Sequence, residues 1–192
     1  MPIAEEGLQN PDAFIYTHSG RKAGPSYIAP PLEDIAVSLG RLCRFAGHGR
    51  RWFPVILHSF IVADLVPEEH RGVALLHDAA EMVTGDVPTP FKGYMLKGLE
   101  DLLLDRLFQA HLGHKLDKKS KAWLAVKEAD SESFLGEVHT IGNSALRGLY
   151  SQRSKRAEKL VRKYLKKYPF EDCISSEGQA VADFVLRVKD CQ

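Results

Sequence analysis

The stretch ALLHDAAEMVTGDVPTPFK, residues 74–92, places several ionisable side chains inside an apolar, helix-like pattern. His77 and Glu81 are four residues apart and Asp78 and Glu81 are three apart, so in a helix both pairs would lie on nearly one face. The alanines and leucines around them predict that much of this helix is buried. Because a buried carboxylate without a partner is costly, we expect other parts of the fold to hold these groups.

Similar patterns on both sides of this stretch predict an all-α protein. Apolar residues three and four apart indicate helices over about residues 32–45, 54–66, 68–83, 96–112, 118–138, 151–167 and 177–188. Pro54 suits the first position of the second helix, and Gly85 and Pro88 suit the end of the third. We therefore expect a helical bundle of about six or seven helices.

The first part of the chain has a different composition. Residues 1–31 are rich in Pro and Gly, which predicts an irregular N-terminal arm with a short hairpin around FIYTHSGRK, residues 14–22. The expected organisation is this arm followed by a single helical domain, residues 32–192.

The overall composition fits a globular protein of 192 residues. With 44% hydrophobic and 27% charged residues, the chain can build a core without disulfides. The formal net charge of +1 argues against a general attraction to nucleic acid or membranes. The most apolar run, residues 52–66, contains Pro54, His58, Ser59 and Asp64, which argues against a membrane span.

The sequence also predicts a cytoplasmic location. A phage protein that acts in the cytoplasm of its host would fit this prediction. Its polar, acidic beginning, MPIAEEGLQN, is unlike a secretory signal. Cys43, Cys173 and Cys191 are far apart and form no CxxC pair, which favours reduced thiols.

A divalent cation would satisfy the ionisable groups of residues 74–92, because imidazole and carboxylate suit Zn, Mn, Fe, Co or Ni. His58 interrupts the preceding apolar helix, and an antiparallel pair of helices joined near Pro67 would bring it level with His77. Asp130 interrupts a third apolar face. Each residue alone is more typical of a core histidine, a cap or a salt bridge, and only their combination favours metal binding.

The order His58, His77-Asp78 and Asp130, with the segment HDxxExxxGDxPTPxK, resembles the HD-domain metal-dependent phosphohydrolases. The closer likeness is to the small branch of bacterial 5′-deoxynucleotidases and phage deoxynucleoside triphosphate hydrolases, and it covers about Ile35 to Asp130. The resemblance implies one catalytic cation, such as Zn, Mn, Co or Mg, bound by those four residues. It also allows a second cation that arrives with the substrate phosphates.

The resemblance further implies roles for neighbouring residues. Glu81 would act on the attacking water, and Asp86 would lie near the sugar and the leaving oxygen. The residues that correspond to substrate-binding positions are Arg44, Phe45, Lys92 and Lys127. The chain departs from the family at Leu57, where relatives often have an acidic residue, and in the loop AGHGRRW, residues 46–52.

These features predict an enzyme that hydrolyses deoxynucleotides at the 5′ phosphoester. His48, Arg50 and Arg51 would add positive charge near Arg44, which favours a dNTP triphosphohydrolase, with dATP as the leading substrate, that releases deoxynucleoside and triphosphate. A solvated basic loop explains the same residues equally well. The alternatives are a 5′-deoxynucleotidase acting on dNMPs and a non-catalytic module that binds nucleotides or nucleic acid.

The basic run RSKRAEKLVRKYLKKY, residues 153–168, overlies an apolar stripe. A packed helix with a solvated basic face is favoured over a nucleic-acid or membrane surface. Contact with a neighbouring subunit is a third interpretation. We expect the protein to form a homo-oligomer. Its expected ligand is a small-molecule nucleotide, and we expect binding to neither nucleic acid nor membranes.

Overall fold

The computed structural model describes residues 12–170 and 174–192 of the chain. Helices dominate these residues, and the sheet found among them is a two-stranded hairpin, so the predicted all-α fold is confirmed. The strands are β1 (Ile15–Tyr16) and β2 (Lys22–Ala23). The α-helices are α1 (Leu32–Arg41), α2 (Val55–Leu65), α3 (Arg71–Leu76), α4 (Glu81–Thr84), α5 (Tyr94–Leu112), α6 (Lys121–Ile141), α7 (Ser144–Leu149), α8 (Lys155–Lys167) and α9 (Ile174–Lys189). Short 3₁₀ helices are η2 (Arg44–Gly47), η3 (Glu68–His70) and η4 (Thr89–Phe91).

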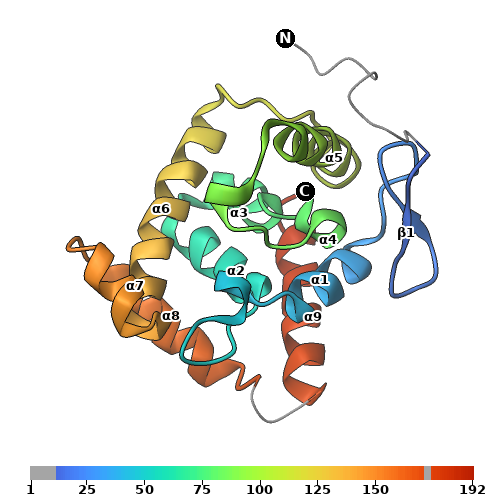
Figure 1. Ribbon diagram of the computed structural model, residues 1–192. Helices are drawn as coiled ribbons and strands as arrows, with labels where there is room; N and C mark the ends of the chain where they lie inside the picture. The colour runs from blue at the N-terminus through green and yellow to red at the C-terminus, as the bar shows by residue number, and fades with distance from the viewer. Residues whose placement is uncertain (1–11, 171–173) are drawn as a thin grey trace.

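Helix α2 lies at the centre of the bundle, where α1, α3, α6, α8 and α9 pack around it (Figure 1). Its sequence is apolar on every side, which is typical of a helix buried all round, and Asp64 is its one residue that is not fully buried. Phe60 stacks on Tyr164 of α8 and on Tyr168, the C-cap of that helix, with ring centroids 5.4 and 5.7 Å away. His58, the fourth residue of α2, is completely buried in this core.

Helices α6 and α8 approach each other closely at Gly136. A Cβ atom at this position would lie 2.5 Å from the Cβ of Ala157, so a side chain there would clash. The side chain of Ser154 accepts a hydrogen bond from the Ala157 amide and caps the start of α8. This contact sets the position of α6, which carries Asp130 and Glu137 towards α2.

The prediction of one continuous helix over residues 68–83 is wrong. Instead η3, α3 and α4 follow one another, with turns over residues 77–80 between α3 and α4. The amides of Ala79, Glu81 and Val83 donate to carbonyls three residues earlier instead of four. Because this gives about 3.0 residues per turn instead of 3.6, side chains that would share one helical face point to different neighbours.

Other boundaries differ by a few residues. Pro54 precedes α2 as its N-cap, with ψ of 155°, and does not occupy the first helical position as predicted. The predicted end of α5 at Gly113 is confirmed, because Gly113 has the left-handed conformation that commonly ends a helix. Helix α7 falls in none of the predicted helices. It begins where the side chain of Asn143 accepts a hydrogen bond from the Leu146 amide.

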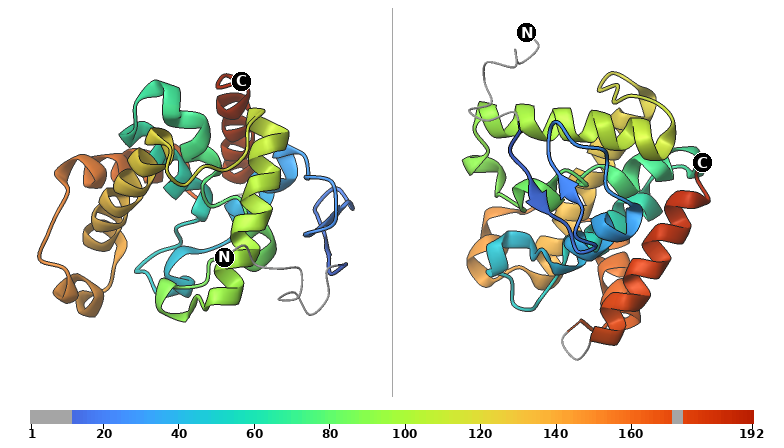
Figure 2. Two further views of the ribbon diagram at one scale, coloured as in Figure 1. Left: turned by 90° about the horizontal axis from the view of Figure 1, so that it is seen from above. Right: turned by 90° about the vertical axis from the view of Figure 1, so that its right-hand side faces the viewer.

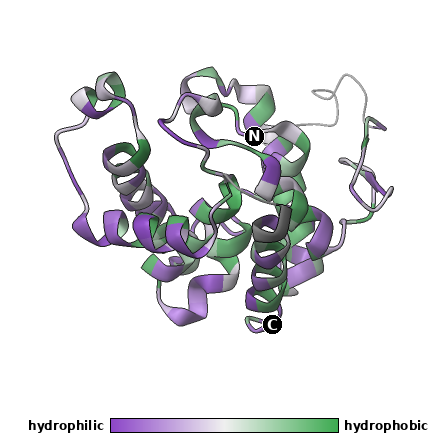
Figure 3. Cartoon of the chain, turned by 90° about the horizontal axis from the view of Figure 1, so that it is seen from below, coloured by the Kyte–Doolittle hydropathy of each residue, from purple (hydrophilic) through white to green (hydrophobic). Residues whose placement is uncertain are grey.

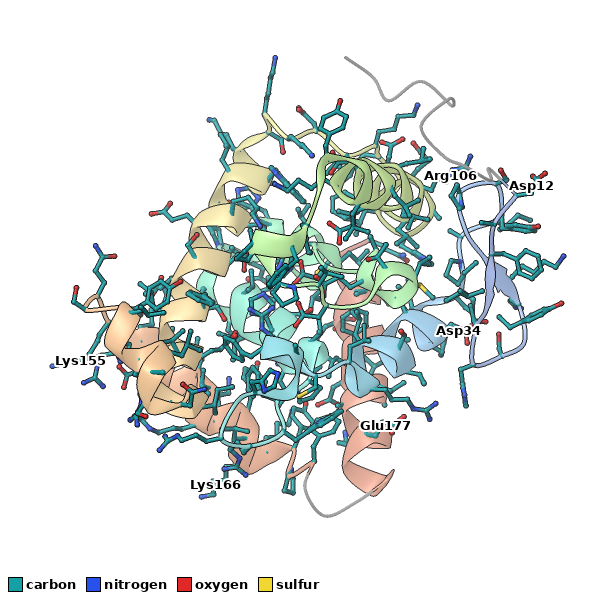
Figure 4. All side chains as sticks on the ribbon, viewed as in Figure 1. Asp12, Asp34, Arg106, Lys155, Lys166 and Glu177 are labelled. Carbon is teal, nitrogen blue, oxygen red and sulfur yellow. The ribbon has the colours of Figure 1, made fainter. Side chains whose placement is uncertain are left out.

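The hairpin predicted around residues 14–22 is confirmed over residues 15–23, and it lies outside the helical bundle at the edge of the molecule (Figure 2). Asp34 of α1 ties it to the bundle (Figure 4). One Asp34 oxygen accepts the Ser19 amide at 2.9 Å, and the other accepts the hydroxyls of Thr17 and Ser19, both at 2.7 Å. Residues 1–11 of the predicted arm lie outside the described residues.

The outward sides of the helices are largely hydrophilic, as Figure 3 shows. Over residues 12–170 and 174–192, the structure contains no helix with the length and apolar character that crossing a membrane requires. Cys43 and Cys191 are free thiols, and Cys173 lies outside the described residues.

Candidate metal centre

The structure brings His58, His77 and Asp130 together from three distant parts of the chain. His58 comes from α2, His77 from the turn after α3, and Asp130 from α6. One ligand atom from each lies within 4.8 Å of the others. The Nε2 atom of His58 is 3.2 Å from the Nε2 atom of His77 and 3.2 Å from Asp130 Oδ1. These three residues form a group that could hold a metal ion.

Asp78 adjoins this group. Its Oδ2 atom lies 3.3 Å from the Nε2 atom of His77 and 3.5 Å from that of His58. Both imidazole side chains are completely buried, whereas the side chains of Asp78 and Asp130 are 19% and 23% exposed. The group is therefore closed on its imidazole side and open towards solvent on its carboxylate side.

The spacing of these atoms fits a cation. Ligands at about 2.0–2.1 Å from a tetrahedral zinc ion lie about 3.3–3.4 Å apart, close to the distances between these nitrogen and oxygen atoms. His77 donates its Nδ1 proton to the carbonyl of Ala74 at 2.7 Å, which leaves the Nε2 lone pair directed at the group. Glu137 accepts a hydrogen bond from His58 Nδ1 at 2.6 Å, which leaves the Nε2 lone pair of His58 directed at the group as well.

Comparisons with known proteins identify relatives but assign no activity. No model of a known family matches the chain. The chain is 36% identical over 138 residues to the uncharacterized protein RCAP_rcc00048 of Rhodobacter capsulatus, a match that covers 64% of this chain and 70% of that protein. The chain belongs to the same family as RCAP_rcc00048.

A second relative is the uncharacterized protein YfdR of Escherichia coli (strain K12). It is 46% identical to this chain over 85 aligned positions, and the match covers 42% of this chain. The match spans about half the length of YfdR, 47%.

The charges in the group favour a bound cation. Burial opposes ionisation of Asp78, but His77 and His58 hold its pKa well below its ordinary range. Burial likewise opposes ionisation of Asp130, and His58 and His77 hold its pKa low. Burial and Arg44 lower the pKa of His58, yet Glu137 and Asp130 outweigh them and raise it to about 9. The centre thus stabilises positive charge, which a metal ion would supply.

Glu81 is buried beside this centre and is held through one of its oxygens. The Nζ atom of Lys92 lies 3.0 Å from Glu81 Oε1 and 3.0 Å from Glu100. The other oxygen, Oε2, is buried and has no hydrogen-bond partner within the part of the chain that the structure describes. Burial, Asp78 and Asp86 together raise the pKa of the Glu81 carboxyl group to about 9. Glu81 therefore offers one fixed, unoccupied oxygen for proton transfer.

Arg44 lies next to the centre in a strained loop. Its Nη1 atom is 4.0 Å from Asp78, and its Nε atom donates to Glu137 at 2.8 Å. Phe45 and Ala46 follow with φ of 58° and 49°, a left-handed conformation that is uncommon outside glycine. Strain of this kind persists only where surrounding contacts impose it, and it is frequent at functional sites.

The two predicted phosphate-binding lysines are engaged with carboxylates. Lys92 bridges Glu81 and Glu100, and Lys127 is paired with Asp130. Asp86 is half-buried just after Gly85, whose φ of 77° ends α4, and burial raises its pKa. Both lysines therefore lie beside carboxylates of the site, and their binding of phosphate stays a prediction.

Sequence reasoning missed Glu137, Ser133 and Glu100. Glu137 and Ser133 are fully buried next to His58, and Glu100 holds Lys92. A signal for Glu137 was present, because it follows Asp130 by seven residues and lies on the same face of α6. No comparable pattern marks Glu100, since its contact joins α5 to a separate loop.

Proposed function

We propose that the protein is a metal-dependent hydrolase of nucleotide phosphoesters, with the HD-domain phosphohydrolases as the family that its motif resembles. The observation that supports this most strongly is the buried Glu81 Oε2, which has no hydrogen-bond partner among the described residues and lies beside the group of His58, His77 and Asp130. An oxygen without a partner is costly in a core, so its retention favours a catalytic role. The ligands of the cation would be His58, His77, Asp78 and Asp130.

A divalent cation bound there would polarise the phosphoryl oxygen and lower the pKa of a water molecule. Beside that positive charge the pKa of Glu81 would fall from about 9 and its ionised form would be favoured, so Glu81 would accept a proton from the water that attacks the phosphorus. The bond between phosphorus and the 5′ oxygen breaks, and the leaving oxygen takes up a proton. Asp86 would supply that proton, and burial raises its pKa. Arg44 would bind the phosphoryl group, since a guanidinium can make paired contacts with it.

We take a deoxynucleoside triphosphate, led by dATP, as the first candidate substrate. The loop that contains exposed His48, Arg50 and Arg51 adjoins Arg44 and is fixed to α6, because the Arg50 amide donates to the carbonyl of Ile141 at 2.8 Å. A fixed basic loop near Arg44 would attract the outer phosphates. The products would be deoxynucleoside and triphosphate.

A deoxynucleoside monophosphate is the second candidate, favoured by a different observation. The guanidinium of Arg50 donates to the carbonyl of Thr140 at 2.9 Å, and Lys92 is shared by two glutamates. Arginine and lysine side chains that are already bonded to other groups have fewer donors left to bind a chain of phosphates. The products would then be deoxynucleoside and inorganic phosphate.

The test is to incubate the purified protein with Mn, Co, Zn or Mg and a panel of dNMPs and dNTPs, and to separate the products by chromatography. We expect deoxynucleoside to form with triphosphate or phosphate as co-product. Nucleotide binding without turnover under every metal would contradict the hydrolase and support a non-catalytic binding module. Size-exclusion chromatography of the same sample tests the expected homo-oligomer.

A further inference from the structure

We propose that Glu137 is a positioning residue that couples the metal centre to the phosphate-binding arginine. It would orient His58 as a ligand and Arg44 as an anion-binding group through the two oxygens of one carboxylate. This inference rests on the proposed function and adds to it a role for a residue outside the motif that the chain shares with the HD-domain enzymes.

Both oxygens of Glu137 are occupied, and the residue is completely buried. Oε1 accepts from His58 Nδ1 at 2.6 Å and from the Ser133 hydroxyl at 2.8 Å. Oε2 accepts from Arg44 Nε at 2.8 Å. Ser133 also lies 3.2 Å from His58 Nδ1. The carboxylate thus joins the core helix α2 to the loop that begins with Arg44.

The bond to His58 determines which ring nitrogen is available to a metal. With the proton held on Nδ1 by Glu137, the lone pair of Nε2 points towards His77 and Asp130, 3.2 Å from each. A carboxylate in this position also increases the basicity of the ligand nitrogen. Loss of the carboxylate should therefore weaken the metal site without removing any ligand.

The bond to Arg44 fixes the plane of its guanidinium group. Because Nε is bonded to Glu137 and the Arg44 side chain is only 12% exposed, its orientation is restricted. Nη1 then lies 4.0 Å from Asp78, beside the metal centre. An anion at the centre would meet a guanidinium that is already oriented, which reduces the entropy lost on binding.

A purely structural ion pair is the alternative explanation for a buried Arg44–Glu137 contact. The two explanations predict different effects of Glu137→Gln, which keeps the size of the side chain but replaces one acceptor oxygen with an NH₂ group. Under the structural explanation only the thermal stability falls. Under the positioning role, affinity for the metal falls as well, and so does affinity for a phosphate anion.

Glu158→Gln provides the matched control. Glu158 is also a buried glutamate, and it is paired with Arg153 and Arg162 on or beside α8. Its carboxylate oxygens accept hydrogen bonds from these two arginines, whereas those of Glu137 accept from His58 and Arg44. Replacing Glu158 removes a buried acidic partner of two arginines but leaves the metal centre intact.

The experiment titrates metal-free protein with Co(II) and follows the visible absorption of the bound ion, then adds inorganic phosphate to the cobalt form. We expect Glu137→Gln to raise the Kd for Co(II) by about 10–100-fold, to change the absorption spectrum, and to weaken phosphate binding. Glu158→Gln should reproduce the wild-type Kd and spectrum. If Glu137→Gln fails to fold, Ser133→Ala is measured instead, with a rise of at least about threefold expected, since it loses one donor to the same carboxylate.

Several results would overturn the inference. A wild-type Kd and spectrum for Glu137→Gln, or for Ser133→Ala where that variant is needed, would make Glu137 a structural residue only. Equal weakening by Glu158→Gln would attribute the effect to stability. In both cases Co(II) binding by the wild type would leave the proposed function in place. Wild-type protein that binds no Co(II) would instead refute the metal centre, and the positioning role with it.

Discussion

The Nε2 atoms of His58 and His77 lie 3.2 Å apart in the core, although the residues are 19 apart in the sequence. Each ring uses its other nitrogen elsewhere, His58 with Glu137 and His77 with the carbonyl of Ala74. Two buried imidazoles that face each other in this way would repel if both were protonated, and a shared cation removes that conflict.

Replacing Glu81 should separate catalysis from metal binding. Glu81→Gln keeps the shape of the side chain but cannot accept a proton, so we expect hydrolysis to fall by about 10²–10⁴-fold. Metal binding should be unchanged, because the ligands are other residues. Product formation and metal content are measured on the same sample. Full activity in Glu81→Gln would refute the role given to this residue.

The two helical glycines Gly136 and Gly148 should respond to alanine in opposite ways. A methyl group at Gly136 would clash with Ala157, so Gly136→Ala should destabilise the fold by about 1–3 kcal/mol. At Gly148, in α7, no atom of the described residues lies within 4 Å of the added Cβ, and alanine should stabilise the helix by about 0.5–1 kcal/mol. Denaturant unfolding measures both. Equal stability of the two variants would contradict the close contact of α6 with α8.

Asp64 should make the stability depend on acid pH. Burial opposes its ionisation, but Lys163, Tyr164 and Arg187 lower its pKa below the ordinary value of 3.8. A group whose pKa is lowered in the folded state contributes stability above its unfolded-state pKa, and this is lost as pH falls through its folded-state pKa. Asp64→Asn should therefore cost about 1–3 kcal/mol at pH 7, and the difference from wild type should shrink below about pH 4.

Asp101→Asn is the control for this measurement. Asp101 is paired with Lys118 at the surface, where such pairs contribute little, so the change should alter stability by less than about 1 kcal/mol. Unfolding curves of the three proteins between pH 2 and 7 are compared, a range set by the ordinary carboxyl pKa of about 3.9. A deficit in Asp64→Asn that persists unchanged at the lowest pH would show that its cause is not the carboxylate charge.

A bound cation should stabilise the folded protein. A ligand that binds only the folded state at about 100 times its Kd adds about 2.7 kcal/mol, so the melting temperature should rise with added Mn, Co or Zn. In His77→Ala this rise should be much smaller, because one ligand is lost. Thermal unfolding with a chelator and with each metal makes the comparison. An equal rise in His77→Ala would mean that the metal binds somewhere else.

The sequence predicted the parts of the fold that depend on apolar periodicity and on strong helix breaks. Helices α1 and α2 begin close to their expected positions because Pro31 and Pro54 precede them. Helix α5 ends where expected because Gly113 follows it. The break between α3 and α4 was not predicted, since its four residues, HDAA at 77–80, contain no Gly or Pro and fit an α-helix as well as a 3₁₀ turn. The short α7 was missed because it has no extended apolar stripe.

The site likewise has residues that the sequence pattern predicted and contacts that it did not. Interrupted apolar faces pointed to His58, His77 and Asp130, and the structure brings these three together. The pairing of Lys92 with Glu81 and Glu100 depends on tertiary contacts between a loop and two helices. No spacing along the chain encodes such contacts, so a glutamate on a helix is more often interpreted as a solvated residue.

The most direct test of the metal centre is an anomalous difference map from crystals grown with Mn or Zn and measured at the absorption edge of that metal. We predict one peak per chain between His58 Nε2, His77 Nε2 and a carboxylate oxygen of Asp130, at about 2.0–2.3 Å from each. A map with no peak between these atoms in the presence of saturating metal would contradict the account.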